Sequence, residues 1–227
     1  MKVSRDILET VYVLHVRTYR ETSLIAEVYS RHRGKLSVIF KGIRSRNSRY
    51  SVMVQPFVPI SMSLFGKSDL KTVANLEFPE KPFAISGKNL ILGMYVNELL
   101  YRLLGKFDPL ESVFDSYEYL LKKFENLSNP ISSLREFELN LLKELGYGIN
   151  FQRDAVSGEV FSPSAHYNFF VNEGFRKTFE FQKITHIFLE IYHVQLTHLI
   201  YDTHNFQELQ LDSNGIKAQS ESSRDLC

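Results

Sequence analysis

The sequence predicts an α+β protein in which an N-terminal five-stranded β-barrel is followed by a mostly α-helical domain. First, residues 10–77 contain five short segments in which apolar and polar residues alternate, as in half-buried strands. Second, beyond Pro79 and Pro82 the spacing of apolar residues becomes helical. Third, residues 1–81 hold 14 Lys or Arg and 7 Asp or Glu, whereas residues 82–227 hold 13 and 19. A basic first part and an acidic second part favour two domains with different partners.

The five expected strands are short, and no helix among them is large enough to cover a sheet. Their apolar faces are therefore buried best if the sheet closes into a barrel, which also removes the edge strands. We expect the strands at residues 10–17, 23–30, 35–41, 55–64 and 70–77. Five strands with a long loop after the third are compatible with an OB-fold, and an SH3-like barrel is the competing interpretation of the pattern.

Helices are expected after the barrel. The first, at residues 87–105, is apolar on nearly all sides and should lie in the middle of its domain. Its polar residues Asn97 and Glu98 should anchor a neighbouring segment, because buried polar groups need hydrogen-bond partners. Further helices are expected from Asp108-Pro109 to about Asn126, from Ser132 or Ser133 to Leu145, and from Ile184 to about Tyr201.

Local signals predict the ends of the third helix and the domain limits. Ser133 and Glu136 have the spacing of a capping box, and Gly146 is placed as a C-terminal cap glycine. Residues 149–181 are irregular, with room for a small hairpin. We expect an OB-fold domain in residues 1–80, a helical domain in residues 83–211 and a flexible tail in residues 212–227.

The candidate binding residues concentrate in residues 31–49, which hold seven Lys or Arg, His32 and no acid. Unopposed cations on neighbouring loops require water or an external polyanion, and arginine suits phosphate oxygens in particular. A solvated basic surface is the competing interpretation. Tyr19 and Tyr50, flanked by polar loop residues, are candidates for stacking on unpaired bases. The candidate DNA-binding residues are Arg31, Arg33, Lys35, Lys41, Arg44, Arg46, Arg49, Tyr19 and Arg20.

The sequence argues against an enzyme, a metal protein and a membrane protein. Cys227 is the only cysteine, which excludes an internal disulfide or a Cys-based zinc site and suits the reducing cytoplasm. We expect no signal peptide and no transmembrane helix, because no long apolar run occurs. Nucleotide-binding and hydrolase motifs are absent. The late histidines are spaced too loosely for zinc; they are His186, His193, His198 and His204.

Nine runs of residues occur in an order that matches a known family. They are Val13–Leu24, Gly34-Lys35, Lys41–Arg44, Gln55–Pro59, Leu64–Gly66, Gly93–Leu100, Leu134–Leu139, Leu145–Gly148 and Ser157–Glu159. Together they resemble the bacterial recombination and repair mediator family RecO. The resemblance implies an OB-fold followed by a helical domain. The residues themselves offer no catalytic residue, and we expect no cofactor. The resemblance also implies a cytoplasmic, nucleoid-associated protein.

The resemblance further implies a set of activities and partners. These are binding of single- and double-stranded DNA, annealing of complementary strands and, with RecR, loading of RecA onto DNA coated by single-strand binding protein. Lys35, Lys41, Arg44, Arg46 and Arg49 match the family's DNA surface.

Arg135 matches an arginine that holds the acidic tail of single-strand binding protein. A groove formed with Val113 and Phe114 would suit such a peptide, whereas a simple pair of Arg135 with Glu138 is the alternative.

Two departures from the family qualify this assignment. The four-cysteine zinc module of some relatives has no counterpart here, so no zinc is expected. Residues 184–211 are nearly free of Lys and Arg, which leaves the barrel as the main expected DNA contact. The alternative function from another class is an OB-fold RNA- or tRNA-binding factor.

Overall fold

The computed structural model describes residues 8–46, 48, 50–78, 80–170 and 173–178. The barrel and the helices that follow it belong to one compact unit. The predicted helix at 184–201 and the predicted tail at 212–227 lie outside the described residues.

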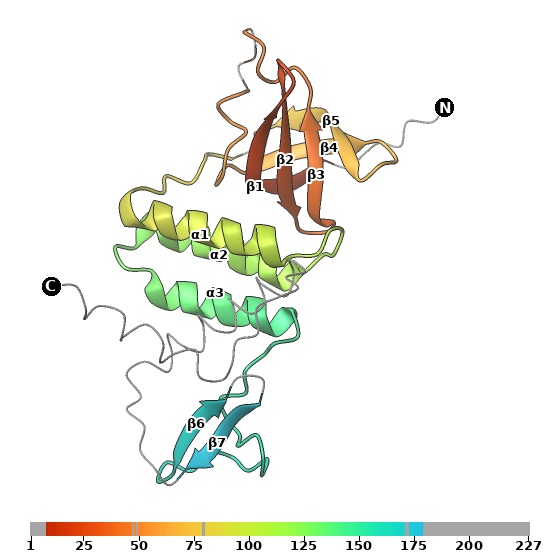
Figure 1. The fold of residues 1–227 in the computed structure, drawn as a ribbon. Helices are drawn as coiled ribbons and strands as arrows, with labels where there is room; N and C mark the ends of the chain where they lie inside the picture. Colours follow the sequence, from red (N-terminus) through yellow and green to blue (C-terminus); the bar gives the residue numbers. More distant parts are fainter. Residues whose placement is uncertain (1–7, 47, 49, 79, 171–172, 179–227) are drawn as a thin grey trace, which may run out of the picture. The chain divides into compact units, whose positions relative to one another are not determined.

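Five strands form a closed barrel in the order β1-β2-β3-β5-β4, with β4 pairing back onto β1 (Figure 1). The pairs are antiparallel except β3 with β5, which run parallel. The predicted α+β class and the OB-fold arrangement of the barrel are therefore confirmed. The strands are β1 (Glu9–Tyr19), β2 (Ser23–Ser30), β3 (Gly34–Phe40), β4 (Ile60–Phe65) and β5 (Leu70–Glu77).

The interior of the barrel is filled by the apolar residues of the alternating patterns. Small and branched side chains predominate, including Val11, Val13, Ala26, Val28, Val38 and Ile60. The fourth strand begins at Ile60 and not at Gln55 as expected. Pro56 and Pro59 cannot donate to a strand ladder, and Phe57 has a φ of +66°, which is incompatible with a strand. Phe57 is instead buried against Gly93 of the first helix, where a Cβ would meet its ring at 2.9 Å.

Three helices follow the barrel: α1 (Gly87–Leu103), α2 (Glu111–Asn126) and α3 (Ile131–Glu144). The predicted capping box at Ser133 is wrong, because the chain turns at Pro130 and α3 begins at Ile131 without a side-chain cap. Gly146 ends α3 with a φ of +88°, as predicted. The expected hairpin is present as β6 (His166–Phe170) and β7 (Gly174–Thr178).

The outer face of the barrel packs against α1 and α2. Tyr12 of β1 and Tyr29 of β2 contact Phe114 and Tyr117 of α2 through their rings. Their hydroxyls donate to the Glu118 carboxylate and to the Leu110 carbonyl oxygen, both at 2.9 Å. The third helix, α3, packs on α2. The barrel is thus joined to the helices by an aromatic cluster with its polar ends satisfied.

The expectation that α1 is covered on all sides is not met within the described part of the chain. One side packs on the barrel and α2, whereas Leu90, Ile91 and Met94 are exposed, Ile91 by 70%. Glu98 is also exposed and pairs with Arg102, so its predicted anchoring role is wrong.

Asn97 fulfils the predicted anchoring role. It is 1% exposed, donates to the Val13 carbonyl oxygen at 3.1 Å and accepts from the Tyr117 hydroxyl at 2.7 Å. One amide therefore connects β1, α1 and α2.

We expect Asn97→Ala to destabilise the fold by about 2–4 kcal/mol, because it leaves two buried polar groups unpaired. Urea denaturation measures this free energy. Glu98→Ala, on the exposed side of the same turn, is the control and should cost less than about 0.5 kcal/mol. Equal losses in the two variants would contradict the anchoring role of Asn97.

Candidate nucleic-acid interface

Strand β3 divides the basic stretch between the two ends of the barrel. Arg31 and Arg33 lie in the turn before β3, at the end that faces α2, whereas Lys41, Arg44 and Arg46 follow β3 at the opposite end (Figure 1). Residues that are continuous in the sequence therefore belong to two separate surfaces.

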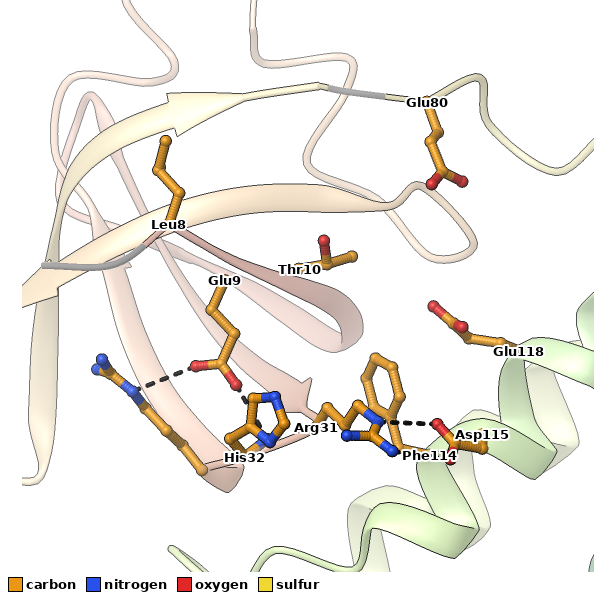
Figure 2. A pocket seen from close by; sticks show the side chains of 10 residues that line it. Leu8, Glu9, Thr10, Arg31, His32, Glu80, Phe114, Asp115 and Glu118 are labelled. Atoms are coloured by element: carbon orange, nitrogen blue, oxygen red, sulfur yellow. Dashed lines mark hydrogen bonds and ion pairs between the residues drawn. The ribbon is translucent and has the colours of Figure 1, made fainter.

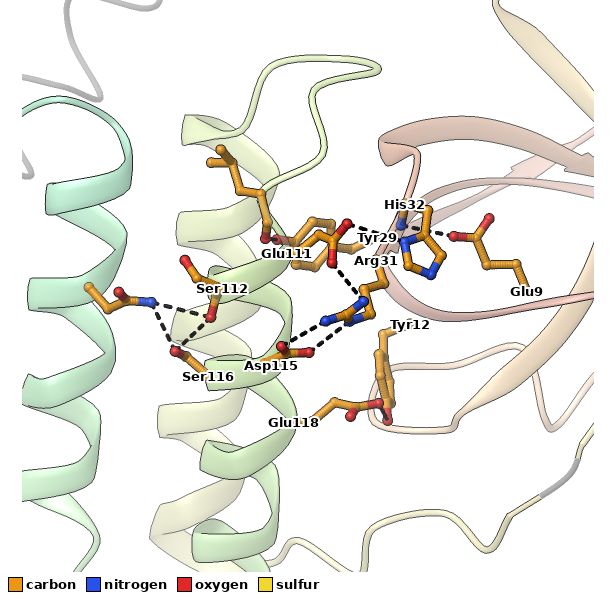
Figure 3. Close-up of polar contacts among 12 residues, drawn as sticks. Glu9, Tyr12, Tyr29, Arg31, His32, Glu111, Ser112, Asp115, Ser116 and Glu118 are labelled. Atoms are coloured by element: carbon orange, nitrogen blue, oxygen red, sulfur yellow. Dashed lines mark hydrogen bonds and ion pairs between the residues drawn. The ribbon is translucent and has the colours of Figure 1, made fainter.

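At the end facing α2, the cations are paired. The Arg31 guanidinium contacts the carboxylates of Glu111 at 2.6 Å and Asp115 at 2.9 Å (Figure 3). Arg33 contacts Glu9 at 3.2 Å. The hydrogen bonds from Arg31 lower the pKa of Asp115, so the pair stabilises this junction at neutral pH and is lost as acid protonates Asp115.

Lys35 is withdrawn from the surface altogether. It is 8% exposed, and its Nζ donates to the Tyr101 carbonyl oxygen of α1 at 2.5 Å. Burial lowers the pKa of Lys35. The prediction that the cations of residues 31–49 are unopposed is therefore wrong for Arg31, Arg33 and Lys35, because their partners come from distant parts of the chain.

An open pocket of about 480 Å³ adjoins these ion pairs (Figure 2). Leu8 and Phe114 are its apolar lining residues, and four carboxylates also line it, from Glu9, Glu80, Asp115 and Glu118. Carboxylates repel phosphate, and Arg31 and Arg33 are already held by acids here. The surface around this pocket is therefore poorly suited to a polyanion.

The opposite end of the barrel has a different character. Lys41, Arg44 and Arg46 are exposed and form no ion pair with any described residue. The Arg44 N–H donates to the Thr22 carbonyl oxygen at 2.9 Å, which ties their loop to the β1–β2 turn. That turn carries Tyr19 and the exposed Arg20, whose guanidinium lies 5.2 Å from the Tyr19 ring centre. We call this group the basic end: Tyr19, Arg20, Lys41, Arg44 and Arg46.

Arg49, another predicted DNA contact, lies outside the described residues. Tyr50, predicted to stack on unpaired bases, does not join the basic end. Tyr50 is half-buried, packs against the barrel core and stacks on Phe78 with ring centres 5.7 Å apart. Its ring therefore serves the barrel and not an exposed stacking surface.

The predicted groove at Arg135 is also built differently. Val113 and Phe114 are buried, and Phe114 faces the aromatic residues of the barrel. Arg135 donates instead to Glu138 at 2.5 Å, and the Tyr95 hydroxyl of α1 donates to the same carboxylate at 2.9 Å. Burial beside Glu138 raises the pKa of Tyr95. The sequence suggested the Arg135–Glu138 pair by its spacing, but nothing in it indicated Tyr95.

Among the described residues, no cluster of His, Cys, Asp or Glu is placed to hold a metal ion. The described helices also include no candidate membrane span, since each is too short or too polar. The late histidines considered in the sequence lie outside the described residues.

Comparison with known proteins decides the family. A model of the N-terminal part of recombination protein O matches residues 3–80, and a model of its C-terminal part matches residues 86–186. The chain belongs to the RecO family. The resemblance noted in the sequence is therefore confirmed.

Individual members of the RecO family are similar over most of their length. A relative from Aliivibrio fischeri is 39% identical over 168 residues, which are 74% of this chain and 71% of the relative. Relatives from Psychromonas ingrahamii and Methylococcus capsulatus are 38% and 36% identical, covering 72% and 75% of this chain and 70% and 71% of theirs. Each of the three is named DNA repair protein RecO.

Proposed function

We propose that the chain acts in DNA repair and recombination as a non-catalytic mediator that holds DNA at the basic end of its barrel. The observation that carries this proposal is the contrast between the two ends. The cations facing α2 are neutralised by acids, whereas Arg20, Lys41, Arg44 and Arg46 are exposed together beside Tyr19. Membership of the RecO family supports the biological role.

The chemistry of the basic end suits both forms of DNA. Guanidinium groups bind phosphate oxygens without reading the base, so single and double strands are both ligands. Neutralised phosphates also repel one another less, which favours annealing of complementary strands held on the same surface. None of these steps needs a catalytic side chain.

The helical domain supplies the partner surface in this proposal. Arg135 lies beside Tyr95, and the apolar side chains of Ile91 and Ile131 are exposed one helical turn before these two residues. A cation next to apolar side chains suits the acidic, aromatic-containing tail of single-strand binding protein. With RecR, such docking would place the protein where RecA is loaded.

The competing function is an RNA- or tRNA-binding factor, since OB-folds also bind RNA. We expect a labelled 30-nucleotide DNA strand to bind more tightly than RNA of equal length and sequence, with fluorescence anisotropy as the measurement. A preference for RNA would support the competing function, and no binding to either would contradict the proposal as a whole.

A further inference from the structure

The loop between α1 and α2 holds an aromatic side chain in an unusual position. Phe107 is 42% exposed, although an apolar ring of this size is normally buried. Its φ is +58°, a conformation that bulky residues rarely adopt. The fold thus maintains a strained backbone that presents this ring to solvent.

The loop is held firmly against the barrel. The Phe107 N–H donates to the Lys35 carbonyl oxygen at 3.0 Å, and Lys106 pairs with Lys35 as a parallel bridge. Gly34 allows the backbone of Asp108 to approach so closely that a Cβ would lie 2.2 Å from its oxygen. Phe107 is therefore a fixed platform and not the tip of a loose loop.

One lysine lies near the ring, and two others are exposed in the neighbouring loops. The Lys71 Nζ lies 5.6 Å from the Phe107 ring centre and donates to the Gly66 carbonyl oxygen at 3.3 Å. Lys67, in the β4–β5 turn, and Lys106 are exposed. Among the described residues, none of these three lysines forms an ion pair with an acid. An exposed aromatic ring flanked by cations is the arrangement with which proteins bind unpaired bases and their phosphates.

The position of the ring connects it to the basic end. On one edge of β3, the Phe107 N–H donates to Lys35, and β5 then pairs with Ser37 to Ile39. Strand β3 ends at Phe40, just before the basic end. The five residue steps from Lys35 to Phe40 span about 17 Å at about 3.3 Å each. One OB-fold covers about 4–16 nucleotides of a single strand, so one strand can reach both places.

We propose that Phe107 stacks on a base of single-stranded DNA, with Lys71 and Lys106 on the adjacent phosphates, as a second contact beyond the basic end. This inference rests on the proposed DNA-binding function. It assigns a ligand to a loop of the helical domain and predicts that single strands gain a contact that paired bases cannot make.

The test compares four proteins on two strands by fluorescence anisotropy. The proteins are the wild type, Phe107→Asn, Phe107→Tyr and the control Phe170→Asn. Asparagine tolerates positive φ, and tyrosine retains a stacking ring. Phe170 is 43% exposed with Arg176 over its ring, but it lies on β6. The strands are a 30-nucleotide thymidine strand and an abasic strand of equal length.

On the thymidine strand, we expect Phe107→Asn to weaken binding by about 5- to 150-fold, the range for loss of one stacked base. Phe107→Tyr and Phe170→Asn should bind like the wild type. On the abasic strand, which keeps the phosphates but has no base, Phe107→Asn and the wild type should be equal.

If Phe107→Asn bound the thymidine strand as tightly as the wild type does, Phe107 would not act as a stacking platform, and the proposed function would remain intact. An equal loss on both strands would also overturn the platform, because the ring would then not act through bases. If the wild type bound neither strand, the proposed function itself would fail.

Discussion

Gly34→Ala is expected to lose about 3–5 kcal/mol of folding free energy. Gly34 has a φ of +68°, which costs other residues about 1–2 kcal/mol. An added Cβ would also overlap the backbone oxygen of Asp108 at 2.2 Å, so the α1–α2 loop must move away from β3. Total stabilities of about 5–15 kcal/mol make this a large fraction.

Gly42→Ala is a matched control for this substitution. Gly42 has the same φ of +68°, but a Cβ there would meet nothing within 4 Å. Gly42→Ala should therefore lose only the folding free energy that a positive φ costs an alanine, about 1–2 kcal/mol. Urea denaturation of both variants separates the free-energy cost of the unfavourable φ from the cost of the steric overlap with Asp108. Equal losses would show that the contact between β3 and the α1–α2 loop contributes nothing.

Replacing three cations of the basic end should weaken binding of a single strand by about 100-fold at about 0.1 M salt. Each phosphate contact contributes about 0.7 to the log–log salt slope for single strands. Loss of three contacts therefore lowers the binding constant by about two powers of ten at this salt concentration. The variant is Lys41→Ala/Arg44→Ala/Arg46→Ala. Its side chains are exposed and lack ion pairs with the described residues, so its stability should be unchanged. Anisotropy titration measures the affinity.

The sequence predicted the barrel well because the signals for strands are local. Alternation of apolar residues marks β2 and β3 as strands, and polar turns mark their ends. It does not predict their burial, because every residue of β3 and all but Glu27 of β2 are buried. The predictions of the α3 start and of the β4 start were wrong where two local signals in the sequence pointed to different structures. Ser133 resembled a helix cap, but Pro130 sets the start of α3, and Phe57 leaves the strand pattern to pack on Gly93.

The candidate site was predictable only in part, because charge neutralisation depends on contacts between distant residues. Nothing near Arg31 in the sequence reveals Asp115, which is 84 positions away. Exposed cations such as Arg44 and Arg46 were correctly grouped in one loop, since that grouping is local. Phe107 was overlooked, although an aromatic residue between Gly105 and Asp108-Pro109, in a loop joining two helices, could have drawn attention to it.

We expect DNA phosphates to contact the cations of the basic end and not the ion-paired Arg31 and Arg33 at the end that faces α2. The most direct measurement is the salt dependence of binding to one labelled 30-nucleotide strand by three proteins: the wild type, the Lys41/Arg44/Arg46 alanine variant and Arg31→Ala/Arg33→Ala. We expect the log–log slope to fall by about 2 in the first variant and to stay unchanged in the second. A slope that falls only in the Arg31/Arg33 variant would place the phosphates on Arg31 and Arg33 and contradict this expectation.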